Sequence, residues 1–320
     1  MILTKQFTNC FVFFIFINMK KIFSFIIFCF YLSLFYSQDK KVFNKIDSLT
    51  SAKDVQDFIN NEHHKINYYL SVDEKIDYDQ YCKVIADSLN LRQNWEKADF
   101  DNNGLTDLLV TGNKHEGYKT IYILDKGDHF EAKNLSLGEL YEKCSFSSVK
   151  DNKIEYQSVK ILSRLGFLSN LIKENLIYKY GGFIEENIAP KRHNILEIEF
   201  ENSGSYWNRS ILEMKIVSNR EVTWISRNDN FLNSGVYTAK LSQEKFKEVV
   251  DLLNYIDFEN LADSYEANYS DAATTYFKVT YDNLKVKNIR DNGGIGTRGL
   301  RQLYDKLIDL QKTEKWIKQN

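Results

Sequence analysis

Residues 235–256 read GVYTAKLSQEKFKEVVDLLNYI, and this stretch predicts a strand that leads directly into a helix. The segment GVYTAKL alternates in the way that is typical of a strand with one buried face. Ser242 occupies the position of a helix N-cap, because its hydroxyl can accept a hydrogen bond from a backbone amide of the first turn. The apolar residues after it recur at helical spacing and define one helix face: Phe246, Val249, Val250, Leu253 and Ile256.

Further strands flank this unit on both sides. Three alternating stretches precede it: NILEIEFEN (194–202), SILEMKIVSN (210–219) and REVTWIS (220–226). Residues 274–292 follow it and predict a β-hairpin that turns near Asp282 and Asn283. A last helix carries an apolar stripe made of Leu300, Leu303, Tyr304, Leu307 and Ile308. Residues 191–320 are therefore predicted to form an α+β domain, in which helices pack on an antiparallel sheet.

The chain before Pro190 divides into two regions. Residues 39–94 are predicted to be a helical segment, because two sets of apolar residues recur at helical spacing. The first set is Val55, Phe58 and Ile59, and the second is Tyr81, Val84, Ile85 and Leu89. Asp77 or Asp79 can cap the second helix. Residues 95–190 contain short strands separated by turn clusters such as KGDH (126–129), so this region is predicted to be β-rich.

The first 38 residues have the order of a secretory signal peptide. Lys20 and Lys21 precede an apolar run from Ile22 to Tyr36, and polar residues follow. Met19 is a second candidate start. The run is short for a membrane span, which needs about 20 residues, and an uncleaved anchor is the alternative. We expect an exported protein, periplasmic or extracellular, with no stable membrane span after cleavage.

The expected mature chain is acidic. The full chain has a formal charge of −2, and residues 1–38 hold three lysines and no acidic residue, so cleavage gives −5. Nucleic-acid binding needs a basic face, and nothing in the sequence suggests one, so we expect no nucleic-acid partner. We expect the partner to be an unknown protein or glycan at the cell envelope.

Only two cysteines, Cys82 and Cys144, follow residue 38. In an oxidising compartment they can form a disulfide. Two separate buried thiols are the alternative, and the sequence leaves both open. Neither cysteine has a second ligand at zinc spacing.

The stretch DFDNNGLTDL (99–108) poses the clearest chemical question in the chain. Its oxygen-bearing groups are spaced as calcium ligands: the side chains of Asp99, Asp101, Asn103 and Asp107, with the carbonyl of Leu105. Val110 stands where an EF-hand has its bidentate glutamate, so an affinity of about 10⁻⁴ to 10⁻³ M is expected. The alternative is an Asn-Gly turn whose acidic side chains accept hydrogen bonds from backbone amides.

This stretch resembles the aspartate loop of FG-GAP and VCBS-type β-repeats. Residues 95–112 carry the resemblance through the pattern D-x-D-x-[DN]-G-x-x-D-[LIV]. Those families build propellers from several copies, whereas this chain has one. The resemblance therefore implies calcium binding by the loop and not a propeller.

A second motif, DNGGIGTRG (291–299), spells a dinucleotide fingerprint at Gly294, Gly296 and Gly299. That fingerprint requires a crossover to a second parallel strand, whereas the strand before this motif pairs in a hairpin. We therefore expect an ordinary loop. Arg298 and the amides at the start of the following helix remain possible ligands for an anion.

Catalytic motifs are few, and we name no catalytic residue. There is no G-x-S-x-G nucleophile elbow, and the carboxylates of Asp263, Glu266 and Asp271 are the main candidates for acid–base work. A pocket that joined Asp263, Asp271 and Arg290 would favour the alternative function, an envelope hydrolase. An exposed aromatic patch from Tyr206, Trp207 and Trp224 would favour a binding module, although strand aromatics are usually part of the core.

The C-terminal region resembles the domain-of-unknown-function family 6438, found in secreted and envelope proteins of Bacteroidota. Three stretches carry the resemblance, at residues 235–265, 270–294 and 300–310. Many members have a Cys-x-x-x-Cys-Pro segment where this chain has ENSGSYWNRS (201–210), so no role of those cysteines carries over. The resemblance implies the α+β fold and the compartment. Together with the sequence patterns, it leads us to expect a non-catalytic binding or envelope-assembly module.

Overall fold

The computed structural model describes residues 44–319, apart from short gaps at 63–69, 74–75, 77, 92–93, 115–116, 139–140, 163–166, 204–210, 228–233 and 270. The expected signal peptide, the proposed cap Asp77, and Tyr206 and Trp207 lie outside the described residues. Residues Asn44–Asn320 belong to one compact unit. None of the described helices is long and apolar enough to span a membrane.

The N-terminal segment contains the short 3-10 helix η1 (Ile46–Ser48) and helices α2 (Ala52–Asn61) and α4 (Gln80–Ser88). Ser51 and Asp54 form a capping box at the start of α2, in which each side chain satisfies a backbone amide of the other. The predicted face of α2 is confirmed, because Val55, Phe58 and Ile59 are buried. They share a core with apolar residues of β2 and β3.

The predicted buried face of α4 is partly wrong. Tyr81 and Val84 are 46% and 67% exposed, whereas Cys82 and Ala86 are buried. The cause is a disulfide between Cys82 and Cys144, which holds this side of the helix against β5. Asp79 caps α4 as expected, accepting a hydrogen bond from the Cys82 amide.

The middle region forms two four-stranded antiparallel sheets, each with its strands in chain order. The first contains β1 (Trp95–Ala98), β2 (Asp107–Lys114), β3 (Gly117–Asp125) and β4 (Phe130–Asn134). The second contains β5 (Glu142–Lys150), β6 (Lys153–Ile161), β7 (Leu168–Lys179) and β8 (Gly182–Glu185). The two sheets share a core, in which Tyr122 of β3 contacts Tyr178 of β7 and Phe183 of β8.

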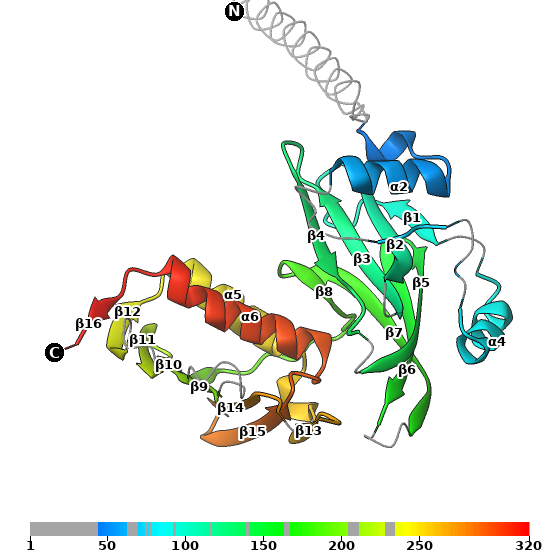
Figure 1. Cartoon of the computed structure of the whole chain (residues 1–320). Coiled ribbons are helices and arrows are strands. Elements are labelled where there is room, and N and C mark those ends of the chain that lie inside the picture. Colours follow the sequence, from blue (N-terminus) through cyan, green and yellow to red (C-terminus); the bar gives the residue numbers. More distant parts are fainter. Residues whose placement is uncertain are drawn as a thin grey trace, which may run out of the picture. The chain divides into compact units, whose positions relative to one another are not determined.

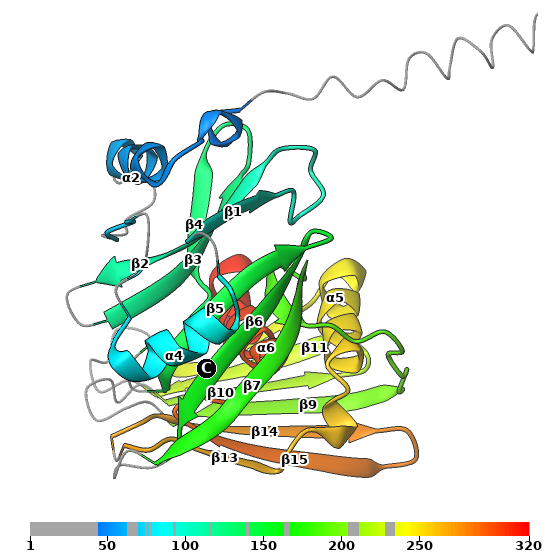
Figure 2. The same ribbon diagram turned by 90° about the vertical axis from the view of Figure 1, so that its right-hand side faces the viewer.

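The C-terminal region contains an eight-stranded sheet in the order β13-β15-β14-β9-β10-β11-β12-β16. Its elements, in chain order, are β9 (Ile195–Asn202), β10 (Ile211–Val217), β11 (Glu221–Arg227), β12 (Gly235–Lys240), α5 (Gln243–Tyr255), η2 (Phe258–Asn260), β13 (Ser264–Glu266), β14 (Thr274–Tyr281), β15 (Lys285–Asn292), α6 (Arg298–Thr313) and β16 (Ile317–Lys318). All pairs are antiparallel except β13 with β15. Figures 1 and 2 show α5 and α6 along one face of this sheet.

Local sequence signals predicted correctly where a helix begins and where a hairpin turns in this region. Ser242 caps α5 by accepting from the Lys245 amide, as predicted. The hairpin turns at Asp282–Leu284, where Asp282 and Leu284 have positive φ. The predicted mixed α+β fold with a β-rich middle is confirmed, and strands dominate it more than expected.

The core between α6 and the sheet sets the first prediction. Leu303 is 0% exposed, so replacement by alanine leaves a cavity and should cost about 2–5 kcal/mol of unfolding free energy in chemical denaturation. Leu162→Ala makes the same chemical change at a residue that is 62% exposed, and should cost within about 0.5 kcal/mol. Equal losses in the two variants would contradict the assignment of Leu303 to the core.

Candidate functional site

The aspartate loop connects β1 to β2. A carboxylate oxygen each from Asp99, Asp101 and Asp107 lies within 4.8 Å of the other two. Asp107 begins β2, pairs with Ala98 across the ladder and is 0% exposed. Three of the predicted ligands are thus brought together.

Backbone amides already occupy much of this carboxylate cluster. The two oxygens of Asp107 accept from the amides of Phe100 and Asp125, at 2.8 Å each. Those of Asp99 accept from Asn103 at 3.1 Å and from Gly104 at 2.9 Å. The acidic side chains therefore shape the turn itself, as in the alternative interpretation of the sequence.

The other two predicted ligands belong to the same turn. The Asn103 side-chain oxygen accepts from the Leu105 amide at 2.7 Å, and its Nδ2 donates to the Asp125 carbonyl at 2.7 Å. Gly104 has φ +83, a left-handed conformation that glycine adopts without steric cost. The glycine of the motif thus has a conformational reason.

The sequence interpretation missed Lys126, whose ammonium lies 2.5 Å from Asp101 Oδ2. Burial raises the pKa of Asp107 to about 7, and the charges of Asp101 and Asp99 contribute. The loop thus concentrates three carboxylates against one ammonium. The candidate ligand atoms of the loop are all oxygens, which are the ligands that calcium prefers.

The carboxylates suggested for hydrolysis are not gathered in one place. Asp263 and Arg290 line a pocket of about 710 Å³ on the sheet, whereas Asp271 lines a different pocket. Asp263 pairs with Lys287 at 2.6 Å, and Glu266 pairs with Arg290. The constellation that would favour a hydrolase is therefore not assembled.

The glycine motif is a loop whose amides are occupied by the protein's own carboxylates. Asp291 accepts from the amides of Ile295 at 2.9 Å and Gly296 at 3.2 Å. Glu185 of β8 accepts from the first amides of α6, those of Arg298 at 2.6 Å and Gly299 at 2.9 Å. An internal anion thus satisfies the start of the helix, so the motif offers these amides to no external phosphate.

Arg298 also turns inward. Its Nε donates to Glu174 at 3.1 Å, and its Nη1 donates to the Leu135 carbonyl at 2.5 Å. The guanidinium lies over the Tyr156 ring, with Cζ 4.3 Å from the centroid. No local pattern pointed to these partners, which lie more than 100 residues away in the sequence.

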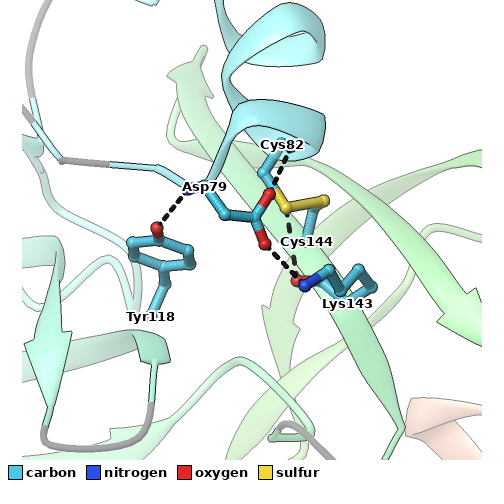
Figure 3. Close-up of a disulfide and its surroundings, with 5 residues drawn as sticks. All are labelled: Asp79, Cys82, Tyr118, Lys143 and Cys144. Carbon is cyan, nitrogen blue, oxygen red and sulfur yellow. Dashed lines mark hydrogen bonds and ion pairs between the residues drawn. A yellow bond between two sulfur atoms is a disulfide. The ribbon is translucent and has the colours of Figure 1, made fainter.

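Cys82 and Cys144 form a disulfide, which decides between the two alternatives (Figure 3). Asp79 makes further contacts beside the disulfide. Its carboxylate accepts a hydrogen bond from the Cys82 amide at 2.9 Å and pairs with Lys143 at 2.5 Å. The backbone amide of Asp79 donates to the Tyr118 hydroxyl oxygen at 2.7 Å. Hydrogen bonding to the Cys82 amide and to Lys143 lowers the pKa of Asp79.

Residues 196–311 match the family model described as Domain of unknown function (DUF6438). The resemblance of the C-terminal region to this family is therefore confirmed, over the part of the chain from β9 to α6. No curated protein and no solved structure matches the chain. The resemblance of residues 95–112 to the FG-GAP and VCBS loops stays a prediction.

The internal anion at α6 gives the second prediction. Glu185→Gln removes the charge and replaces one acceptor oxygen with a donor, so it should lower the unfolding free energy by about 1–3 kcal/mol. The neighbouring Glu186→Gln removes only a surface ion pair with Lys153 and should cost less than about 1 kcal/mol. Urea denaturation of both variants checks this, and a neutral Glu185→Gln would show that the helix start does not depend on the carboxylate.

Proposed function

We propose that this protein is an exported, non-catalytic module that binds a partner or assists assembly at the cell envelope. The disulfide is the observation that carries the proposal. Cys82 and Cys144 are 0% and 1% exposed and are separated by 62 residues, so the bond joins the N-terminal segment to the second sheet. Disulfides persist in oxidising compartments, and the secretory order of residues 1–38 agrees with that destination.

The pairing and separation of the charged side chains support a binding role over a catalytic one. Among the described residues, the carboxylates considered for hydrolysis are paired with cations or lie in separate pockets. General acid–base catalysis needs an acid and a base close to the same substrate atom, and this arrangement does not supply them. The partner we propose is a protein or glycan of the envelope.

We also propose that the aspartate loop is a weak calcium site formed by Asp99, Asp101, Asn103, Leu105 and Asp107. The cluster of three carboxylates supports this, because one ammonium leaves excess negative charge in a partly buried loop. Each carboxylate oxygen that accepts one amide keeps a lone pair for a cation. Calcium there would stabilise the turn and take no part in chemistry.

The export proposal predicts a fully oxidised mature protein. Expression of the full chain in a bacterial host should yield a processed protein beginning near residue 39, without free thiols on alkylation under denaturing conditions. Reduction should lower its unfolding free energy by about 2–4 kcal/mol, because it frees a loop of 62 residues. The Cys82→Ser/Cys144→Ser variant should not respond to reductant. An unprocessed cytoplasmic protein with two free thiols would contradict the proposal.

The calcium proposal predicts a melting shift that depends on pH. At pH 8 and 10 mM calcium, mass action should raise the melting temperature by roughly 3 to 10 °C over chelator. Asp99→Ala/Asp101→Ala should abolish the shift, whereas Asp128→Ala, in a nearby turn and with its side chain 87% exposed, should keep it.

The pH dependence has a defined sign. The pKa of Asp107 in the folded protein, about 7, lies above its value of about 3.9 in an unfolded chain. Protonation therefore stabilises the fold, and this contribution is lost as the pH rises from about 4 to about 7. Calcium competes with that proton, so its effect on melting should be smaller at pH 5 than at pH 8. Equal shifts at both pH values, or none at pH 8, would contradict the site.

A further inference from the structure

A pocket of about 880 Å³ lies where α6 meets the middle sheets. One face of α6 lines it with Arg298, Arg301 and Tyr304, which follow one another at helical spacing. Lys133 of β4 and Asp271 also line it. The pocket is therefore built by segments from two regions of the chain.

Arg298 has one nitrogen left over. The residue is only 7% exposed, and its Nε and Nη1 donate to Glu174 and Leu135. Among the described residues, none accepts from its buried Nη2. A buried donor without an acceptor costs free energy, so Arg298 leaves a donor beside the pocket that the described residues do not satisfy.

Arg301 is less satisfied still. In the described part of the chain, its guanidinium forms no hydrogen bond or ion pair, and its Nε is buried. Burial lowers its pKa, and the positive charge of Arg298 lowers it further. The buried Tyr304 hydroxyl, one helical turn away, also has no partner within the described residues.

The neighbouring carboxylates do not fill this gap. Glu185 is committed to the amides of α6, and Glu174 holds Arg298. Glu142 bonds Tyr156 at 2.5 Å, and its own pKa is raised by burial, which favours the neutral form. All three act on Arg301 only at a distance. Asp291 and Asp305 also act on it electrostatically, but among the described residues no acceptor bonds the Arg301 guanidinium.

The rest of the pocket lining adds hydrogen-bond acceptors and aromatic rings. Asp271 and Asp305 line the pocket and can accept from hydroxyl groups, while Asn134 offers an amide. Tyr122, Phe183 and Tyr269 supply aromatic groups. Arginine forks match carboxylates, and the acidic lining would repel a ligand that carried negative charge alone.

We propose that this pocket binds a small hydroxylated organic carboxylate, the chemistry of a sugar acid. Its carboxylate accepts from the Arg301 guanidinium, and its hydroxyls donate to Asp271 and Asp305. The inference rests on the proposed binding function and names the ligand class.

Isothermal titration of the oxidised protein with D-glucuronate tests it, with D-glucose and inorganic phosphate as comparison probes. The wild-type protein should bind glucuronate, and it should bind glucose and phosphate more weakly. Arg301→Gln should weaken binding about tenfold or more, because it removes a charged donor. Arg301→Lys keeps the positive charge but loses the forked guanidinium, so its affinity should lie between those of wild type and Arg301→Gln. Arg227→Gln, which removes an arginine of β11 outside this pocket, should change the affinity less than twofold.

Several results would overturn the inference: no binding of glucuronate to wild type, equal binding of glucose, tighter binding of phosphate, or unchanged affinity in Arg301→Gln. Melting curves of each variant establish that it is folded. The export proposal is tested separately by processing and thiol state. An oxidised, processed protein that ignores glucuronate would therefore refute the pocket assignment and leave the export proposal standing.

Discussion

The contact between the C-terminal region and the two middle sheets depends on the buried guanidinium of Arg298. It lies at the start of α6, yet its partners are Glu174 in β7, the carbonyl after β4 and the Tyr156 ring in β6. A buried charge is tolerated only when it is paired, and loss of one partner typically costs about 3–5 kcal/mol. One side chain of the C-terminal region thereby requires both middle sheets to be in place. Glu185 adds a second link, because it neutralises the same helix start from β8.

This arrangement explains why the glycine pattern leaves no free amides for a phosphate. The glycines provide a tight turn and a helix start, but Asp291 and Glu185 have taken the amides that would face a nucleotide. A Cβ at Gly299 would lie 2.4 Å from Ile256 Cγ2, so close packing on α5 also accounts for this glycine. The motif thus serves packing and internal charge, and what remains free lies further along α6, at Arg301.

The sequence predicted what depends on near neighbours. Caps at Asp79 and Ser242, the hairpin near Asp282 and the apolar face of α2 each depend on residues within one or two turns. It failed where a distant contact decides the outcome. Apolar spacing alone favoured Tyr81 on the buried side of α4, but the bond to Cys144 selects Cys82. Likewise Lys126, Glu174 and Glu185 have no local pattern to mark them, because their partners lie 25 to 124 residues away.

The same reasoning separates the two places where polar groups are left without full compensation. In the aspartate loop, the surplus is negative, and the turn is already held by its own amides, so a cation there would add stability to a formed structure. At α6, hydrogen-bond donors of Arg298, Arg301 and Tyr304 lack acceptors among the described residues, and these residues line a cavity with aromatic and amide groups. Ligand sites are usually concave and hold a few polar groups, as this cavity does, whereas the carboxylates of the loop are engaged by its own amides. The proposed binding function is therefore assigned to the α6 pocket, and the proposed role of the loop is structural.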